Sequence, residues 1–217
     1  MTRILVCVLS CQKNKALWPT ILDRIKNNII IFSGGSETTQ FNESTKILYL
    51  NCNDFYEGLP EKMILMIEHV LSLETFKDVT HILKIDDHDI DFISDSESLA
   101  KLSNRDELWK HDYIGQTLRE VPGSGYGGCH FGKVSKGCYW DSKFYTGPFT
   151  SWLDGGHTYI LSRTALEVIN TNYDSNNINL LRANEIYEDV MIALILAEYG
   201  IKPFVLSYFL KPGVKIA

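Results

Sequence analysis

Residues 81–91 read HILKIDDHDID, so an apolar run leads directly into four aspartates and a second histidine. Residues 81–85 have the length and the apolar character of a buried strand. Carboxylates crowded this closely repel one another, and burial makes each charge costlier. Either the acids spread into solvent on a loop, or a divalent cation such as Mg²⁺ or Mn²⁺ gathers them. The preceding strand and a second acidic pair far downstream, Glu188 and Asp189, favour the metal site over a plain acidic loop.

The composition indicates a globular protein. The chain has 217 residues, 45% of them hydrophobic, which suits one α/β domain spanning residues 1–217. Its net charge of −6 and scattered basic residues argue against a nucleic-acid partner. No apolar run reaches the roughly 18 residues of a membrane span, and the five cysteines form no CxxC pair. We therefore expect a soluble, cytoplasmic protein with reduced thiols.

Strand-like and helix-like segments alternate along the chain. Apolar runs predict strands at residues 4–9, 28–32, 46–50, 81–85 and 113–116, then after the paired glycines 155–156, and at 204–210. Helices are expected at residues 19–25, 60–71, 99–109, 163–169 and 187–199. The second of these has the clearest signal, because its apolar residues recur at helical spacing and Pro60 suits its first turn. The alternation predicts an α/β fold, with a doubly wound, mostly parallel sheet and helices on both faces.

Residues 122–139 are rich in glycine and poor in aliphatic side chains. The segment is not a P-loop, because Gly132-Lys133 is followed by Val134 and not by serine or threonine. Long irregular segments inside a compact domain tend to be lids over a site or to be disordered. Both interpretations stay open for this segment.

Five segments between residues 48 and 203 resemble, in the same order, motifs of glycosyltransferase family 31, the inverting β1,3-galactosyl- and N-acetylglucosaminyltransferases and their Fringe relatives. They are Asp54-x-Tyr56-x-x-Leu59-x-x-Lys62, Lys84-Ile85-Asp86-Asp87, Tyr113-Ile114-Gly115, Gly156-x-x-Tyr159-Ile160-Leu161-Ser162, and Glu188-Asp189-Val190 followed by Gly200-Ile201-x-Pro203. Each segment alone is weak, and their common order makes the resemblance specific. It implies a fold of the GT-A type, a single doubly wound α/β domain, in agreement with the pattern above.

The resemblance also implies a reaction: transfer of a sugar from a UDP-sugar to a glycan or glycoprotein acceptor, with Mn²⁺ or Mg²⁺ bridging the diphosphate. Asp189 is expected to be the catalytic base, in a helix's first turn where the dipole favours its ionised form. The metal is expected at Asp87 and Asp89. Contacts to the donor nucleotide are expected from Ser10, Cys11, Lys62, Asp86 and Asp87. The residues expected on the acceptor side are Trp152, Asp154, Gly155, Gly156 and Glu188.

Several of these residues also have ordinary structural interpretations. Asp189 could simply cap a helix. Asp154 would either bind sugar hydroxyls or accept a hydrogen bond from its own loop. His157 would be either an ordinary strand histidine or a replacement contact for metal or phosphate. The aromatic residues that would either stack on sugars or pack in the core are Trp140, Tyr145 and Trp152.

The sequence departs from the family pattern at three points. The third acid of the metal motif falls on His88, unless Asp89 takes that role. No histidine follows His157, although the family commonly completes its metal site with one near the carboxyl end. The stem and membrane anchor of the Golgi enzymes are missing, which favours a bacterial or viral enzyme, or a domain of a longer chain.

Two other functions remain open. A metal-dependent phosphohydrolase or nucleotidyltransferase also needs clustered aspartates, although haloacid-type phosphatases place the nucleophilic aspartate after the first strand, where this chain has Ser10-Cys11-Gln12. A non-catalytic, sugar-binding remnant of a transferase would explain His88 in place of an acid.

Overall fold

The computed structural model describes residues 2–90, 102–120 and 126–206. Its strands are β1 (Ile4–Leu9), β2 (Ile29–Ser33), β3 (Gln40–Asn42), β4 (Ile47–Tyr49), β5 (His81–Asp86), β6 (Tyr113–Gly115), β7 (Leu118–Arg119), β8 (Trp152–Leu153), β9 (Tyr159–Ser162) and β10 (Phe204–Val205). Its α-helices are α1 (Trp18–Arg24), α2 (Leu59–Ser72), α4 (Arg163–Asn172), α5 (Leu181–Asn184) and α6 (Glu188–Glu198). Short 3₁₀ turns cover Gln12–Leu17, Tyr56–Gly58, Glu74–Phe76, Leu108–Lys110, Tyr126–Gly128, Gly155–His157 and Ile178–Leu180.

The described strands form an eight-stranded sheet in the order β10-β6-β9-β5-β1-β2-β4-β3, and β7 pairs with β8 in a separate ribbon. β1 is parallel to β5 on one side and to β2 on the other, with Leu9 opposite both Asp86 and Phe32. β3 and β9 run antiparallel to the other six strands. The prediction of a mostly parallel α/β sheet is therefore confirmed.

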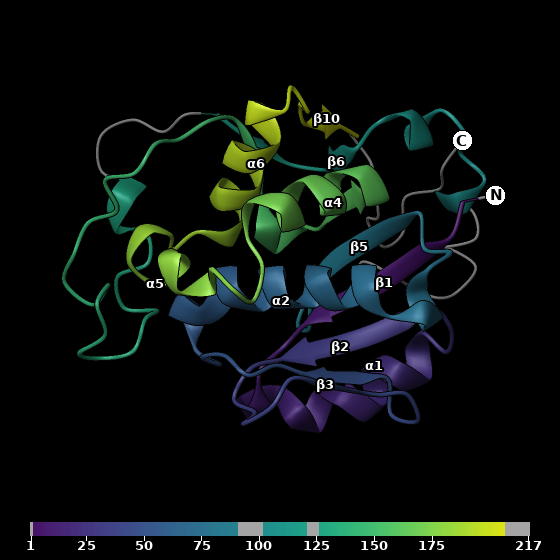
Figure 1. Cartoon of the computed structure of the whole chain (residues 1–217), viewed down its shortest axis with the longest axis horizontal. Helices are drawn as coiled ribbons and strands as arrows, with labels where there is room; N and C mark the ends of the chain where they lie inside the picture. The colour runs from purple at the N-terminus through teal and green to yellow at the C-terminus, as the bar shows by residue number, and fades with distance from the viewer. Residues whose placement is uncertain (1, 91–101, 121–125, 207–217) are drawn as a thin grey trace.

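Helices cover both faces of the sheet, as the packing of β1 shows. Successive side chains of a strand point to opposite faces. Leu5, Cys7 and Leu9 pack into a core with α2, α4 and α6, whereas Ile4, Val6 and Val8 pack into a second core with α1. Figure 1 shows α2 and α4 on the near face of the sheet. A central parallel strand buried on both faces explains why residues 4–9 are continuously apolar.

The sequence does not indicate the direction of β9. The chain leaves β6 at the carboxyl edge of the parallel strands and stays at this end through the turn Gly155–His157, where Lys84 contacts Gly155. The next strand has to run back across the sheet, so β9 is antiparallel to both β5 and β6.

The main helix boundaries follow their sequence signals. Pro60 lies in the first turn of α2. Ser162 caps α4 by accepting a hydrogen bond from the Ala165 N–H at 3.1 Å. Gly200 follows α6 with a φ of 75°, a conformation that glycine adopts without strain.

For three predicted segments, the structure describes only part of the predicted range. Of the helix predicted at 99–109, residues 99–101 lie outside the described part, Leu102 and Ser103 are helical, and Leu108–Lys110 form a 3₁₀ turn. Of the strand predicted at 204–210, the described part forms β10, Phe204–Val205, and residues 207–210 lie outside it. Of the glycine-rich segment, residues 126–139 form turns, and 122–125 lie outside the described ranges.

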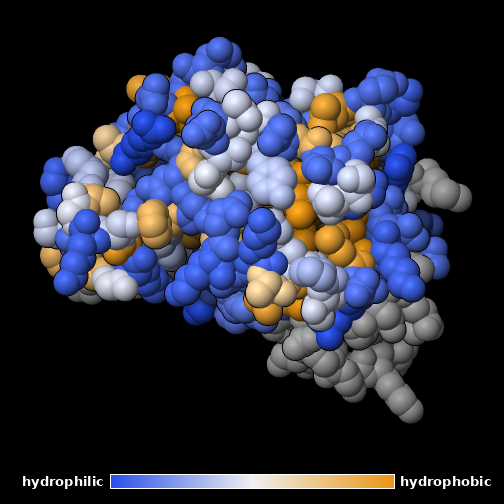
Figure 2. All heavy atoms as spheres, turned by 90° about the horizontal axis from the view of Figure 1, so that it is seen from below, coloured by the Kyte–Doolittle hydropathy of each residue, from blue (hydrophilic) through white to orange (hydrophobic). Residues whose placement is uncertain are grey.

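Within the described residues, no helix is both long enough and apolar enough to cross a membrane. All five cysteines are free. The surface seen from below is mostly hydrophilic, with hydrophobic side chains gathered in a patch right of the centre of the view (Figure 2).

Candidate functional site

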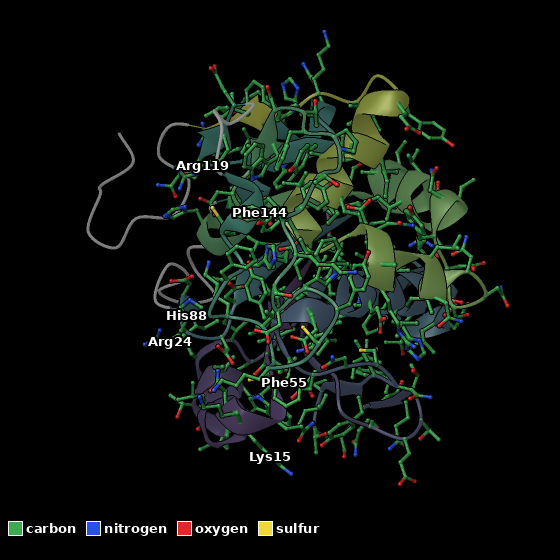
Figure 3. All side chains as sticks on the ribbon, turned by 90° about the vertical axis from the view of Figure 1, so that its left-hand side faces the viewer. Lys15, Arg24, Phe55, His88, Arg119 and Phe144 are labelled. Carbon is green, nitrogen blue, oxygen red and sulfur yellow. The ribbon has the colours of Figure 1, made fainter. Side chains whose placement is uncertain are left out.

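A cleft of about 610 Å³ lies at the carboxyl ends of β1 and β5. The chain continues from β1 through α1 to β2 on one side, whereas β5 lies on the other side of β1 and is reached through α2. Strand order reverses at this point, and open α/β sheets bind their ligands at such a crevice. Figure 3 looks at this end of the molecule, where His88, Phe55 and Arg119 come from three different segments that line the cleft.

A tight turn after β5 shapes the acidic motif. The Asp89 N–H donates to the Asp86 carbonyl oxygen at 3.0 Å, as in a β-turn with Asp87 and His88 at its corner. One ligand atom from each of Asp86, His88 and Asp89 lies within 4.8 Å of the others. Of the two expected metal ligands, Asp89 belongs to this group and Asp87 does not, although Asp87 Oδ1 lies 3.5 Å from His88 Nδ1.

Asp87 lies outside this cluster because its backbone still belongs to the sheet. Its N–H donates to the Leu9 carbonyl oxygen at 3.0 Å, and only 5% of the residue is exposed. Its Oδ2 accepts hydrogen bonds from the Ser10 hydroxyl at 2.6 Å and from Asn14 Nδ2 at 2.9 Å. The Ser10 oxygen in turn accepts from Trp18 Nε1 at 2.7 Å. Asp87 thus joins the end of β5 to the segment after β1.

The Asp86, His88 and Asp89 cluster fits a divalent transition metal. Carboxylate oxygens suit Mg²⁺ and Mn²⁺ alike, but an imidazole ligand suits transition metals better than Mg²⁺. Burial, opposed by the charge of His88 and supported by that of Asp86, raises the pKa of Asp89. A cation bound beside Asp89 would favour the ionised form of this carboxyl group.

Asp54 and Lys62 hold the floor of the cleft together. Lys62 is buried, and its Nζ lies 2.9 Å from Asp54 Oδ1 and donates to the Ser10 carbonyl oxygen at 3.2 Å. The Asp54 carboxylate also accepts from the backbone N–H groups of Gln12 and Gly34. Lys62, expected as a donor contact, therefore lines the cleft with an ammonium group that already has three partners. Cys11, expected beside Ser10, lines the cleft and is partly exposed.

Lys84 is a buried cation in the middle of β5, 1% exposed. Its Nζ lies 2.7 Å from Asp86 Oδ1 and 3.1 Å from Glu188 Oε1, and it donates to the Gly155 carbonyl oxygen at 2.8 Å. Burial alone would lower the pKa of Lys84, but these two carboxylates raise it above its usual value. Glu188 also accepts from the Tyr159 hydroxyl at 2.8 Å, so both its oxygens are engaged. Glu188, expected on the acceptor side, therefore serves the scaffold of the cleft.

Asp189 lines the same cleft from the first turn of α6. Its Oδ2 accepts from the Gly155 N–H at 3.0 Å, and its Oδ1 accepts from the Val190 N–H at 2.9 Å. Burial, followed by the charge of Glu188, raises the pKa of Asp189 to about 7. Burial thus outweighs the helix dipole, which was expected to favour the ionised form.

Asp154 accepts the hydrogen bond from its own loop that was one of its two interpretations. Its Oδ1 accepts from the Gly156 N–H at 3.0 Å. Its Oδ2 accepts from Arg119 Nη2 at 2.6 Å and lies 3.1 Å from His157 Nδ1. Burial raises the pKa of Asp154, but Arg119 and His157 outweigh it and lower the pKa below its usual value. His157 lies in a 3₁₀ turn and not in a strand, and the metal-type cluster contains His88 instead.

Trp152, expected on the acceptor side, is only 1% exposed, which matches its other interpretation, packing in the core. Trp140 and Tyr145 are buried as well, at 5% and 4%. They pack with His130, which is fully buried and contacts the Tyr187 hydroxyl at 2.9 Å. These aromatic residues therefore form a core behind the cleft.

Several residues that line the cleft are not among the expected site residues. The sequence pattern could have indicated Lys84, because a lysine inside a continuous apolar strand needs a buried partner. No such pattern indicates Asn14, Arg119 and Lys133, because ordinary polar residues outside motifs are common. Lys133 comes from the glycine-rich segment, and its Nζ lies 5.4 Å from the centre of the Tyr56 ring.

Gly155 offers a test of this geometry. A Cβ at this position would lie 2.5 Å from Glu188 Oε1 and 3.3 Å from the Asp189 Cβ. Because Glu188 is fixed by Lys84 and Tyr159, Gly155→Ala should displace the acidic pair, costing about 1–3 kcal/mol of stability and roughly 10²-fold in activity. Gly156→Ala is the matched control, since its Cβ would meet only Asp154 Oδ1, at 3.4 Å. Thermal unfolding and turnover of the two variants are the measurements, and equal effects would contradict the geometry.

Comparison with known proteins does not assign a family. No family model matches the sequence, and no curated protein matches it. A solved structure of a cytidylyltransferase from Leptospira borgpetersenii serovar Hardjo-bovis (strain JB197) is similar over 96% of this chain and 78% of that chain, with 11% sequence identity and a TM-score of 0.44. At this distance the similarity supports no argument about function.

Proposed function

We propose that the protein is a metal-dependent glycosyltransferase of the GT-A type that moves a sugar from a UDP-sugar to a hydroxyl of a glycan or glycoprotein, with inversion at the anomeric carbon. One observation carries the proposal: a carboxyl group with a pKa of about 7, Asp189, lines the same cleft as Asp86 and His88 of the metal-type cluster after β5. The order of the five sequence segments between residues 48 and 203 supports it.

The charge of the cleft supports a role for a metal. Six acidic and four basic residues line it, and two of the basic ones, Lys62 and Lys84, are buried in ion pairs. A diphosphate entering this surplus of negative charge would be repelled. A cation bound to Asp86, His88 and Asp89 would change the local electrostatic potential from negative to positive. When bound, the metal would offset the negative charge that develops on the departing diphosphate.

The remaining chemistry falls to the residues of the chain. Asp189 in its ionised form takes the proton from the acceptor hydroxyl as the oxygen forms its bond to the anomeric carbon and the bond to the diphosphate breaks. A pKa of about 7 lets Asp189 hold this proton at neutral pH. The Gly155 N–H fixes one carboxylate oxygen, and Lys84 fixes Gly155 through its carbonyl oxygen. Lys133 contributes positive charge to the wall of the cleft, where Arg119 is paired with Asp154.

Metal dependence gives the first test of the proposal. UDP should bind at least tenfold more tightly with Mn²⁺ than with EDTA in calorimetric titrations. His88→Ala and Asp89→Asn should each lose most of this difference, because each removes one of three ligands. Asp78→Asn is the matched control, since Asp78 is exposed and pairs with Arg3 away from the cleft. Equal UDP affinity with Mn²⁺ and with EDTA would contradict the metal role.

The products separate the proposed reaction from its alternatives. With a panel of UDP-sugars and Mn²⁺, a glycosyltransferase should release UDP slowly even when water is the only acceptor. A phosphohydrolase would release inorganic phosphate or UMP, and a nucleotidyltransferase would form pyrophosphate from a nucleoside triphosphate. A sugar-binding remnant would release none of these products.

A further inference from the structure

A second cavity of about 440 Å³ lies between residues 139–148 and the connection from α4 to α6. Its volume is within the usual range for small-molecule sites. It shares no lining residue with the cleft. We call it the aromatic pocket, and the residues used below are Tyr139, Lys143, Phe144, Tyr173, Asn184 and Glu185.

Aromatic side chains are unusually exposed here. Phe144 is 60% exposed and Tyr139 is 50% exposed, and both line the pocket. Figure 3 shows Phe144 on the side of the molecule onto which the carboxyl ends of the strands open. Large apolar side chains that gather at a cavity on the surface often mark a binding site. The C–H faces of a ring-shaped ligand could pack against Phe144.

The polar groups of the pocket suit a neutral ligand with hydroxyl groups. Glu185 offers a carboxyl group, and Lys143 offers an ammonium group. Asn184 uses its Nδ2 to bond the Leu180 carbonyl oxygen, which leaves its Oδ1 as an acceptor. Burial raises the pKa of Glu185 to about 7, so this group carries only part of a negative charge at neutral pH. Hydroxyl groups both donate and accept, and so match such a mixed set.

A cationic ligand fits the pocket less well. The Lys143 Nζ lies 3.6 Å from the centre of the Tyr139 ring, so a cation of the protein already uses this aromatic face. A quaternary ammonium ligand would compete with that contact and would be repelled by Lys143.

The pocket also lies close to Asp189. Glu185 and Asp189 are four residues apart, and four residues span at most about 14 Å even when fully extended. Tyr187 lies between them in the chain, lines the cleft, and packs against Tyr145 with ring centres 5.3 Å apart. A single oligosaccharide could therefore reach from the aromatic pocket to the cleft.

We propose that the aromatic pocket binds a neutral sugar unit of an oligosaccharide, removed along the chain from the hydroxyl that reacts at Asp189. Phe144 packs against the apolar face of this sugar, and Glu185 and Lys143 bond its hydroxyl groups. Sugar binding in the pocket is independent of the metal, whereas its role as the outer part of an acceptor site rests on the proposed function.

Binding without donor or metal tests the pocket itself. Lactose, cellobiose and maltose at millimolar concentration, in EDTA, are the probes for saturation-transfer NMR and for chemical-shift titration of the labelled protein. We expect at least one disaccharide to bind, and Phe144→Ala and Glu185→Ala each to weaken it at least fivefold. Tyr199→Ala and Glu198→Ala are the matched controls, because both residues are exposed and lie outside the two cavities. Asp189→Asn should bind the disaccharide like the unaltered chain.

Each outcome of these measurements either supports or contradicts sugar binding in the aromatic pocket. Loss of binding in the pocket variants but not in the controls supports it, even if no UDP-sugar turns over, and the proposed function alone would then fail. If turnover occurs, Phe144→Ala should raise the KM for oligosaccharide acceptors, and Tyr199→Ala should leave that KM unchanged. No disaccharide binding, binding that the pocket variants leave intact, or binding of tetramethylammonium there instead would overturn the inference. Circular dichroism spectra of the variants verify that each is folded.

Discussion

Replacing Asp189 with asparagine is expected to lower turnover by about two to four orders of magnitude, the range for loss of a general base. Asparagine keeps the shape of the side chain and can still accept the hydrogen bond from the Gly155 N–H. UDP affinity should therefore change little. In the unaltered chain, kcat/KM should rise with pH up to about 7 and then level off, because Asp189 must be ionised to take a proton. The variant should lack this rise.

Asp189→Asn should lower turnover, but it should raise the stability of the fold. The pKa of Asp189 is about 7 in the folded chain and about 3.9 in an unfolded one, so the folded state holds the proton more tightly. This contribution to stability is complete below the unfolded pKa and is lost as pH rises through 7. Asp189→Asn should therefore gain in melting temperature relative to the unaltered chain between pH 5 and pH 8. A variant that keeps its activity, or whose melting temperature gains nothing over this interval, would contradict the role of Asp189 as a base of raised pKa and leave it only its bonds in the first turn of α6.

Replacing Lys84 with methionine is expected to destabilise the fold by about 3–5 kcal/mol, the cost of leaving a buried charge without its partner. Glu188 is the group left behind, with its side chain 6% exposed. In a protein of this size, this corresponds to a fall in melting temperature of roughly 6–20 °C. Lys77→Met is the matched control, because Lys77 pairs with Glu74 on the surface and both side chains are more than half exposed. An exposed pair of this kind contributes about 1 kcal/mol at most.

A double variant identifies the cause of this effect. Lys84→Met combined with Glu188→Gln removes the cation together with the buried charge it compensates. It should recover a substantial part of the stability lost by Lys84→Met alone, since a buried pair is costly mainly when broken from one side. If the double variant is no more stable than the single one, Lys84 acts through Asp86 and the Gly155 carbonyl oxygen and not through Glu188.

The elements that the sequence predicts well are those whose pattern lies within one segment. The apolar run of β1, the helical stripe of α2 and the Ser162 cap of α4 are local, and the structure contains all three. β3, β7 and β8 are two or three residues long, too short for an alternating pattern to show. The direction of β9 depends on the edge of the sheet at which the chain arrives, and periodicity does not record this.

The sequence predicts which region of the chain forms the site, but it does not predict which way each side chain of the site points. The sequence marks residues 86–89 as acidic, but it does not show that the Asp87 carboxylate bonds Ser10 after β1 whereas the Asp86 carboxylate bonds Lys84. Trp152 shows the same limit, since an aromatic residue near a predicted site packs in a core as readily as it binds a sugar. Only the packing of segments distant in sequence separates these outcomes.

The buried bonds around Lys84 also have a consequence for how the molecule is made. Ser10 and Asp87 are 77 residues apart, Lys84 and Gly155 are 71 apart, and the ion pair of Lys84 with Glu188 spans still more of the chain. Such distant pairings form slowly, because a long loop must close before they contribute. At about 5–20 residues per second, a ribosome needs roughly 5–20 s to advance from Lys84 to Glu188. During synthesis Lys84 therefore has no Glu188 to pair with until the ribosome has translated residue 188. The cleft is among the last parts of the molecule to form.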